Sequence, residues 1–176
     1  MKYKQSGIWS ELIPSLSFRR NWHTEEDSKI LCKYADMMTP EQTILEIGSA
    51  EGQSGITMLL ASESLLQIIE PVVTTNLINN IKCMDLTDRV VILPTTSERA
   101  RLALGNVGLL FIDGEHTYKM VKHDLEKFSK ANPRFIILHD TDKPELAQAV
   151  KEFVEQGAYL YEESGANITV LSKLEQ

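Results

Sequence analysis

The sequence predicts an α/β fold, in which a doubly wound sheet of five parallel strands is followed by an antiparallel hairpin. Two observations lead to this prediction. Short apolar or β-branched runs alternate with helix-spaced apolar residues, as in a parallel sheet covered by helices on both faces. The last two strand-like runs, 157–161 and 168–172, are separated only by residues 162–167. That connection is too short for a crossover helix, so these two strands should pair antiparallel.

The positions of the individual strands and helices follow from the same alternation of short apolar runs and helix-spaced apolar residues. The five parallel strands are expected at Thr43–Ile47, Leu65–Ile69, Val90–Leu93, Val107–Ile112 and Phe135–Leu138. The helices between and around them are marked by apolar residues at helical spacing: Ile30, Tyr34, Met38; Ile56, Leu59, Leu60; Leu77, Ile81, Met84; Tyr118, Val121, Leu125, Phe128; Leu146, Val150, Phe153. The nearly continuous apolar run of the fourth strand is what burial on both faces requires.

The composition is that of one ordinary globular domain. The chain has 176 residues, of which 43% are hydrophobic and 24% charged, which excludes a disordered chain. No repeat, linker or charge block divides it, so a single domain over 1–176 is expected, with an N-terminal extension (1–23) and a core (24–176).

Charge and hydropathy limit the partners. The net charge is −7, whereas nucleic-acid-binding proteins usually carry an excess of basic residues. No apolar run approaches the roughly 20 residues of a membrane-spanning helix, and the first residues lack the apolar core of a signal peptide. Cys32 and Cys83 stand far apart and are expected to be buried free thiols. We therefore expect a cytoplasmic protein.

A glycine turn follows the first strand. The segment Ile44-Leu45-Glu46-Ile47-Gly48-Ser49-Ala50-Glu51-Gly52 ends a strand and leads directly into a helix. Small residues there let backbone N–H groups approach a ligand at the helix N-terminus. The spacing is not G-x-G-x-x-G, which disfavours a nicotinamide or flavin dinucleotide. A second acid, Glu70, ends the next strand, where a carboxylate can hold ribose hydroxyls. A turn that merely links strand to helix is the alternative interpretation.

The chain resembles the class I S-adenosylmethionine-dependent methyltransferases, which have a Rossmann-like sheet. Three features carry the resemblance: the turn with Glu46, Gly48 and Gly52, the acid Glu70, and the C-terminal hairpin. The resemblance covers nearly the whole chain and implies that S-adenosylmethionine is the cofactor. In this family the glycine turn cradles the methionine part and the second-strand acid binds the ribose. Where relatives often read Gly-Asp-Ser after the third strand, this chain has Pro94-Thr95-Thr96-Ser97. The residues implied for cofactor binding are Glu46, Gly48, Ser49, Ala50, Gly52, Glu70, Thr96, Ser97 and Asp113.

A second group of polar residues follows the fourth and fifth strands. The fourth is followed by Asp113-Gly114-Glu115-His116-Thr117-Tyr118, and the fifth by His139-Asp140. This pattern looks like the subfamily that includes macrocin O-methyltransferase and cephalosporin-biosynthesis enzymes. Its members act mostly on sugars and secondary metabolites, and several carry a divalent metal at these two strand ends. The resemblance implies that Asp113, His116, His139 and Asp140 handle the acceptor.

The residues themselves leave the chemistry open. If the two strands are neighbours, the carboxylates of Asp113 and Asp140 converge at the carboxyl edge of the sheet. Oxygen ligands of this kind suit Mg²⁺, which can acidify a substrate hydroxyl. Without a metal, His116 or His139 would take the proton as general base. In the structural alternative, the two acids only cap the following helices.

The expected function is S-adenosylmethionine-dependent methyl transfer to an oxygen of a small molecule, a sugar or secondary metabolite. The alternatives are a non-catalytic S-adenosylmethionine-binding domain or, with less support, a nicotinamide-dependent oxidoreductase. The expected partner is the small-molecule acceptor, with neither membrane nor nucleic acid, and a homo-oligomer is left open. Trp9, Trp22 and His23 precede the first core helix and are candidates to cover the cleft, with packing on the surface as the favoured alternative for the two tryptophans.

Overall fold

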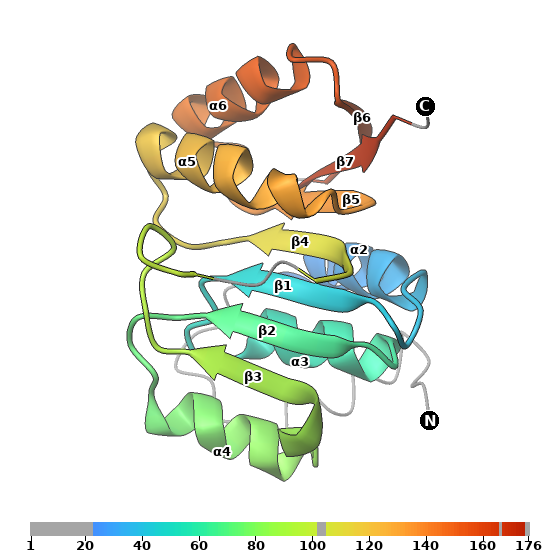
Figure 1. Cartoon of the computed structure of the whole chain (residues 1–176), viewed down its shortest axis with the longest axis vertical. Coiled ribbons are helices and arrows are strands. Elements are labelled where there is room, and N and C mark those ends of the chain that lie inside the picture. The colour runs from blue at the N-terminus through green and yellow to red at the C-terminus, as the bar shows by residue number, and fades with distance from the viewer. Residues whose placement is uncertain (1–22, 102–104, 166, 175–176) are drawn as a thin grey trace.

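Seven strands form one sheet in the order β3-β2-β1-β4-β5-β7-β6 (Figure 1). The structure is a computed structural model that describes residues 23–101, 105–165 and 167–174. The strands are β1 (Thr43–Ile47), β2 (Leu65–Ile69), β3 (Val90–Leu93), β4 (Val107–Ile112), β5 (Phe135–Leu138), β6 (Tyr159–Ser164) and β7 (Thr169–Lys173). The helices are α2 (Glu25–Asp36), α3 (Gln53–Ala61), α4 (Thr75–Cys83), α5 (Tyr118–Phe128) and α6 (Pro144–Val154), with 3-10 turns η3 (Thr87–Arg89) and η4 (Ser129–Ala131).

The pairing confirms the predicted topology. Strands β1 to β5 pair in parallel, whereas β7 lies antiparallel between β5 and β6. The five parallel strands begin and end at the predicted residues. The hairpin strands do not, because β6 is an edge strand whose Leu160 and Tyr161 are exposed, so its apolar pattern does not mark its end. The turn between β6 and β7 is closed by a hydrogen bond in which Gly165 donates its N–H to the carbonyl oxygen of Ile168 at 2.8 Å.

The sheet is buried on both faces, as two-sided helix cover requires. Successive residues of β1 face opposite clusters: Ile44 packs with α2, α3 and α4, while Leu45 packs with α5 and α6. All residues of β4 are buried. Threonines cap α2, α4 and α5, and Thr117 caps α5 as its position predicts, accepting from the N–H of Met120.

Two points differ from the expectations or lie outside the described residues. Cys32 is buried as expected, but Cys83 is exposed, because it is the last residue of α4 and faces solvent. Trp9 and Trp22 lie outside the described residues. None of the helices in the described part of the chain is long and apolar enough to cross a membrane.

The strand order creates the position of the site. From β1 the chain moves outward through β2 and β3, then returns to the other side of β1 with β4 and β5. The loops after β1 and β4 therefore diverge, and a crevice opens at the carboxyl edge of the sheet between them. Two hydrogen bonds hold this edge together: Gly48 donates to the carbonyl of Ile69 at 2.9 Å, and Asp113 donates to that of Ile47 at 2.8 Å.

Candidate active site

A cavity of about 580 Å³ lies at this carboxyl edge. Its volume is within the range of small-molecule sites. Segments that follow β1, β2, β3, β4 and β5 all line it. The lining includes these predicted site residues: Gly48, Ser49, Ala50, Glu70, Thr96, Ser97, Asp113, His116, His139 and Asp140. Glu46 and Gly52 do not line it. The structure therefore brings both predicted groups of residues to one cavity.

The glycine turn needs its small residues for two physical reasons. Gly48, Ala50 and Gly52 all have positive φ, at 78°, 47° and 89°. A Cβ on Gly48 would also lie 2.3 Å from the carbonyl oxygen of Asp113, which belongs to the rigid backbone after β4. Glycine thus allows the turn after β1 to pack directly against the strand end that carries Asp113. The N-terminus of α3 follows at once, and its N-cap, Gly52, makes no side-chain capping hydrogen bond.

Glu70 braces this turn. One oxygen, Oε2, accepts hydrogen bonds from the backbone N–H groups of Ser49 and Ala50, both at 2.9 Å, and Oε1 accepts from Val72 at 3.0 Å. Its side chain is buried and lines the cavity. The acid predicted to bind ribose therefore lies where a ligand can reach it, while it also fixes the backbone of the turn.

Glu46 lies behind the turn, beneath α3. It is fully buried and accepts a hydrogen bond from the hydroxyl of Ser54. Burial raises the pKa of the Glu46 carboxyl to about 7, and the negative charges of Asp113 and Glu70 add to this rise against the hydrogen bond from Ser54. Glu46 thus anchors the start of α3 to β1, and its predicted contact with a cofactor stays a prediction.

Thr96 and Ser97 form the wall that follows β3. The Thr96 Oγ1 atom is buried and has no hydrogen-bond partner among the described residues. The carbonyl oxygen of Ser97 accepts from Lys127 of α5 at 2.5 Å, which holds the loop in place. An unsatisfied hydroxyl on a cavity wall is a group that a ligand can satisfy.

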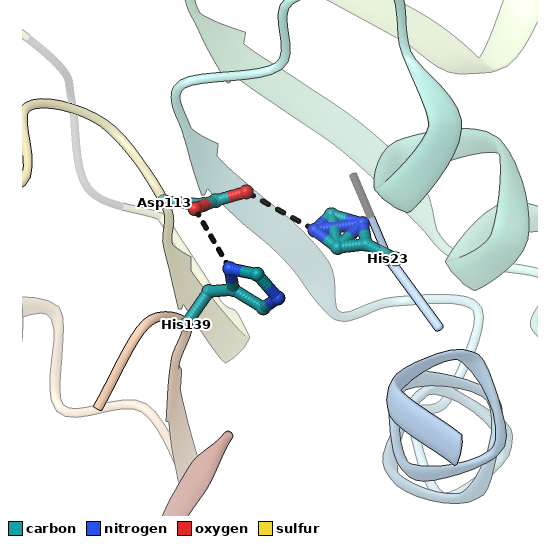
Figure 2. Close-up of side chains that lie close together, drawn as sticks. All are labelled: His23, Asp113 and His139. Atoms are coloured by element: carbon teal, nitrogen blue, oxygen red, sulfur yellow. Dashed lines mark hydrogen bonds and ion pairs between the residues drawn. The ribbon is translucent and has the colours of Figure 1, made fainter. Parts of the chain in front are cut away.

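At the other end of the cavity, Asp113 lies between histidines from distant segments (Figure 2). Its Oδ2 is 3.1 Å from Nε2 of His23, which precedes α2, and its Oδ1 is 3.4 Å from Nδ1 of His139, which follows β5. The Oδ1 atom also lies 3.2 Å from Nε2 of His116. We call His23, Asp113, His116, His139 and Asp140 the charged cluster.

His116 links the two strand-end acids. Its Nδ1 is 2.8 Å from Oδ2 of Asp140, while its Nε2 faces Asp113. Lys143 also approaches Asp140 Oδ2, at 2.7 Å. The carboxylates of Asp113 and Asp140 therefore converge as expected, with the ring of His116 in contact with both.

The environment sets the charge of each histidine differently. For His139, burial lowers the pKa, but the carboxylates of Asp113 and Asp27 outweigh it and raise the pKa to about 10. For His23, burial dominates and lowers the pKa to about 4, so this ring is neutral at pH 7. The hydrogen bond with Asp113 raises the pKa of His116 against a smaller effect of its partial burial.

Three members of this region were not singled out by sequence reasoning as working residues. His23 was expected only as a cover or surface residue, while Asp27 and Lys143 were not considered. Asp27 forms the capping box of α2 with Thr24, and its Oδ2 also lies 3.7 Å from Nε2 of His139. Its place in a Thr-x-x-acid pattern was visible, but that pattern explains a helix start by itself.

Comparisons with known proteins agree with this geometry. Residues 45–141, more than half of the chain, match the family model described as a methyltransferase domain. A comparison with curated proteins finds no match.

Solved structures share the fold at low sequence identity. A tRNA (m1A58) methyltransferase from Aquifex aeolicus is 16% identical, with a TM-score of 0.73 over 94% of this chain and 76% of that one. A precorrin-6y C5,15-methyltransferase from Geobacter metallireducens is 14% identical, with a TM-score of 0.73 over 93% and 95%. An O-methyltransferase from Bacillus cereus, in complex with SAH, is 17% identical, with a TM-score of 0.67 over 91% and 86%. The family match and the seven-stranded sheet together show that this chain belongs to the methyltransferase domain family.

Proposed function

We propose that the protein transfers a methyl group from S-adenosylmethionine to an oxygen of a small molecule. The observation that carries this proposal is one cavity with the glycine turn at one end and the charged cluster at the other. The first end offers small residues and the Glu70 carboxylate to a cofactor. The second offers ionisable side chains to an acceptor. A similar fold in an O-methyltransferase that holds SAH supports the same assignment.

The residues at the first end fit such a cofactor. Gly48 lets the turn pack against the backbone of Asp113 at the cavity, and Glu70 follows β2 with its carboxylate on the cavity wall. The buried Thr96 hydroxyl has no hydrogen-bond partner among the described residues, so a cofactor can bond to it. We propose that the 48–52 turn, Glu70, Thr96 and Ser97 hold the cofactor. When bound, S-adenosylmethionine supplies an electrophilic methyl group on a sulfonium.

The protein's own contribution is to position the acceptor and to remove its hydroxyl proton. We propose His116 as the proton acceptor in preference to His139. His139 is buried between carboxylates that keep it protonated at neutral pH, so it has no lone pair to accept a proton. His116 lines the cavity and is partly exposed, and Asp113 at Nε2 orients its ring and stabilises the imidazolium that forms. The acceptor hydroxyl would take the place of the Asp140 carboxylate at Nδ1.

A Mg²⁺ ion between Asp113 and Asp140 stays a prediction, in which the metal would acidify the hydroxyl. The described geometry supports it only in part. The two acids and His116 offer ligand atoms within 4.8 Å of one another. However, the ammonium of Lys143 already lies 2.7 Å from Asp140, where it neutralises the carboxylate that a hard cation needs.

A sugar or secondary metabolite is the proposed acceptor class, as in the macrocin-type subfamily that the strand-end motifs resemble. The net charge of −7 argues against a nucleic-acid acceptor, although a tRNA methyltransferase shares the fold. The cavity volume also suits a small molecule.

Two measurements test the proposal. S-adenosylhomocysteine should raise the melting temperature, whereas NAD should not, and Gly52→Leu should abolish the shift. Labelled S-adenosylmethionine with a panel of hydroxylated acceptors should then show turnover. Stabilisation by NAD alone would reverse the assignment. A thermal shift without turnover on any acceptor would favour a non-catalytic cofactor-binding domain.

Variants of the histidines separate binding from catalysis. His116→Gln should lose turnover and keep the S-adenosylhomocysteine shift. His123→Gln, on α5 outside the cavity lining, is the matched control and should keep both. Turnover should fall as the pH drops through the pKa of His116, which lies above the ordinary value of 6.5. Full turnover in His116→Gln would exclude this residue as the base.

A further inference from the structure

We propose that His23, Asp113 and His139 form a binding site for one divalent transition-metal ion of the Zn²⁺ type. This ligand set differs from the Asp113 and Asp140 pair expected from the strand-end motifs. Metal binding by these three residues depends neither on the acceptor nor on methyl transfer, so it can be tested in the free protein.

The spacing of the donor atoms fits a small ion. Asp113 presents one oxygen to each histidine, at 3.1 Å from Nε2 of His23 and at 3.4 Å from Nδ1 of His139. One ligand atom from each of the three residues lies within 4.8 Å of the other two. Ligands about 2.1 Å from a tetrahedral Zn²⁺ ion lie about 3.4 Å from one another. Figure 2 shows one imidazole facing each oxygen of the Asp113 carboxylate.

The rings are held in place before any ion arrives. The side chains of His23 and His139 are only 3% and 6% exposed. The His23 ring meets the rings of Phe111 and His139 edge to face, with centroids 5.8 Å and 4.5 Å apart. Little side-chain freedom is therefore left to lose on binding, which favours affinity.

Asp27 lies at ion-pair distance from the far nitrogen of His139, beyond the length of a hydrogen bond, and an ion at Nδ1 would draw the two together. Its Oδ2 lies 3.7 Å from Nε2 of His139, while the Nδ1 atom of the same ring faces Asp113. Thr24 fixes Asp27 in turn, through its backbone N–H at 2.8 Å and its hydroxyl at 2.7 Å. A carboxylate on the far nitrogen orients a ligating imidazole and strengthens it as a donor. The ion would replace the proton on Nδ1 of His139.

The donor set selects the class of metal. Two imidazole nitrogens and one carboxylate suit Zn²⁺ and its first-row neighbours, whereas Mg²⁺ prefers oxygen ligands alone. All three residues line the cavity, so the remaining coordination position faces the space where a ligand would bind. Three protein ligands with one open position are typical of catalytic rather than structural zinc sites.

Calorimetry on the full-length chain, without a histidine tag and after removal of metals by a chelator, tests the proposal. Titration with ZnCl₂ should give one ion per chain, and MgCl₂ should give no comparable binding. His23→Gln and His139→Gln should each weaken Zn²⁺ binding more than about 100-fold, and Asp27→Asn about 10-fold to 100-fold. The matched control is His123→Gln, which should keep the affinity within about threefold, because His123 lies on α5 outside the cavity lining.

Imidazole nitrogen NMR on the unmodified chain keeps the test independent of variant folding. The chain has four histidines, and Zn²⁺ should shift the signals of His23 and His139 most. The signal of His116, which contacts Asp113 from outside the set, should shift less, and that of His123 should stay in place. His116→Gln and His123→Gln assign the signals without replacing a proposed ligand. Absence of stoichiometric Zn²⁺ binding would overturn the site. A shift of His116, with binding lost in Asp140→Asn, would move the metal to the strand-end acids. Neither outcome would bear on S-adenosylhomocysteine binding, which tests the proposed function separately.

Discussion

At the glycine-turn end of the cavity, a short backbone turn forms the wall, whereas at the charged end side chains from separate segments form it. The turn is a local structure: Gly48, Ala50 and Gly52 lie within five consecutive residues, and Glu70 holds them through backbone N–H groups. The charged cluster joins His23, Asp113 and His139, which are far apart in the sequence. The first end therefore depends on conformation and close packing, and the second on balanced charge. Substitutions should act differently at the two ends.

The largest effect on stability is expected for Gly48→Ala. Its Cβ would meet the backbone of Asp113 and Gly114 at 2.3 Å and 2.6 Å, with φ at +78°. Left-handed strain and overpacking against rigid backbone should together cost about 3–4 kcal/mol of unfolding free energy. Urea denaturation measures this cost. The matched control is Gly157→Ala, which has a φ of +83° but nothing within 4 Å of its Cβ and should cost only about 1 kcal/mol. Equal costs at the two glycines would show that close packing at Gly48 contributes nothing.

A pH effect is expected behind the same turn. The pKa of Glu46 is about 7 in the folded chain against its ordinary 4.5, so the unfolded chain releases this proton first as the pH rises. The free energy of unfolding should therefore fall by about 3 kcal/mol between pH 4.5 and pH 7, then level off. The difference in unfolding free energy between the wild type and Glu46→Gln, measured by urea denaturation across that range, isolates this contribution. A difference that does not change with pH would mean that Glu46 ionises normally in the folded chain.

Glu70→Gln tests the brace of the turn. Its carboxylate accepts three backbone hydrogen bonds, and an amide leaves only one acceptor oxygen. We expect a loss of about 1–2 kcal/mol in stability and a weaker thermal shift with S-adenosylhomocysteine. Glu98→Gln is the matched control, because Glu98 also lines the cavity but is exposed, and it should change stability by less than about 0.5 kcal/mol. If Glu98→Gln costs as much as Glu70→Gln, the loss reflects net charge rather than the brace.

The smallest effect on stability is expected at the charged end. Asp140→Asn removes the ion pairs with His116 and Lys143 and a longer one with His139 at 3.6 Å, but the Lys143 side chain is 42% exposed and screened by solvent. Asparagine also tolerates the positive φ of 58° at this position. Stability should change by less than about 1 kcal/mol, while turnover falls and the S-adenosylhomocysteine shift remains. A loss beyond 2 kcal/mol, roughly that of a buried pair, would assign Asp140 a structural role.

The sequence predicted what is local or periodic. The five parallel strands were located to the residue, because burial on both faces imposes apolar runs and because Gly48, Glu70 and Asp113 mark where three of them end. The end of β6 was missed, since an exposed edge strand carries no such pattern. The glycine turn and the two strand-end acids were recognisable because they directly follow these apolar runs.

The remaining site residues are placed by tertiary packing. His23 joins the cluster only because α2 packs against the sheet face that carries Phe111. Asp27 has a sufficient local explanation as a capping residue, so its approach to His139 has no separate signal in the sequence. Without an alignment of relatives, spacing alone cannot link residues from the start of the chain to the ends of β4 and β5.

The insertion of β7 between β5 and β6 has a consequence for the order of events during synthesis. Until residue 169 has left the ribosome, β5 is an edge strand, with one row of backbone groups unpaired. The loop after Asp140 also lacks the bonds from Thr141 to Asn167 and Thr169 that fix it. A nascent chain that already contains every residue of the charged cluster therefore cannot yet hold that cluster in shape. The site is complete only when the β6–β7 hairpin pairs with β5. A chain stalled before that point exposes an unpaired strand edge that can associate with other chains.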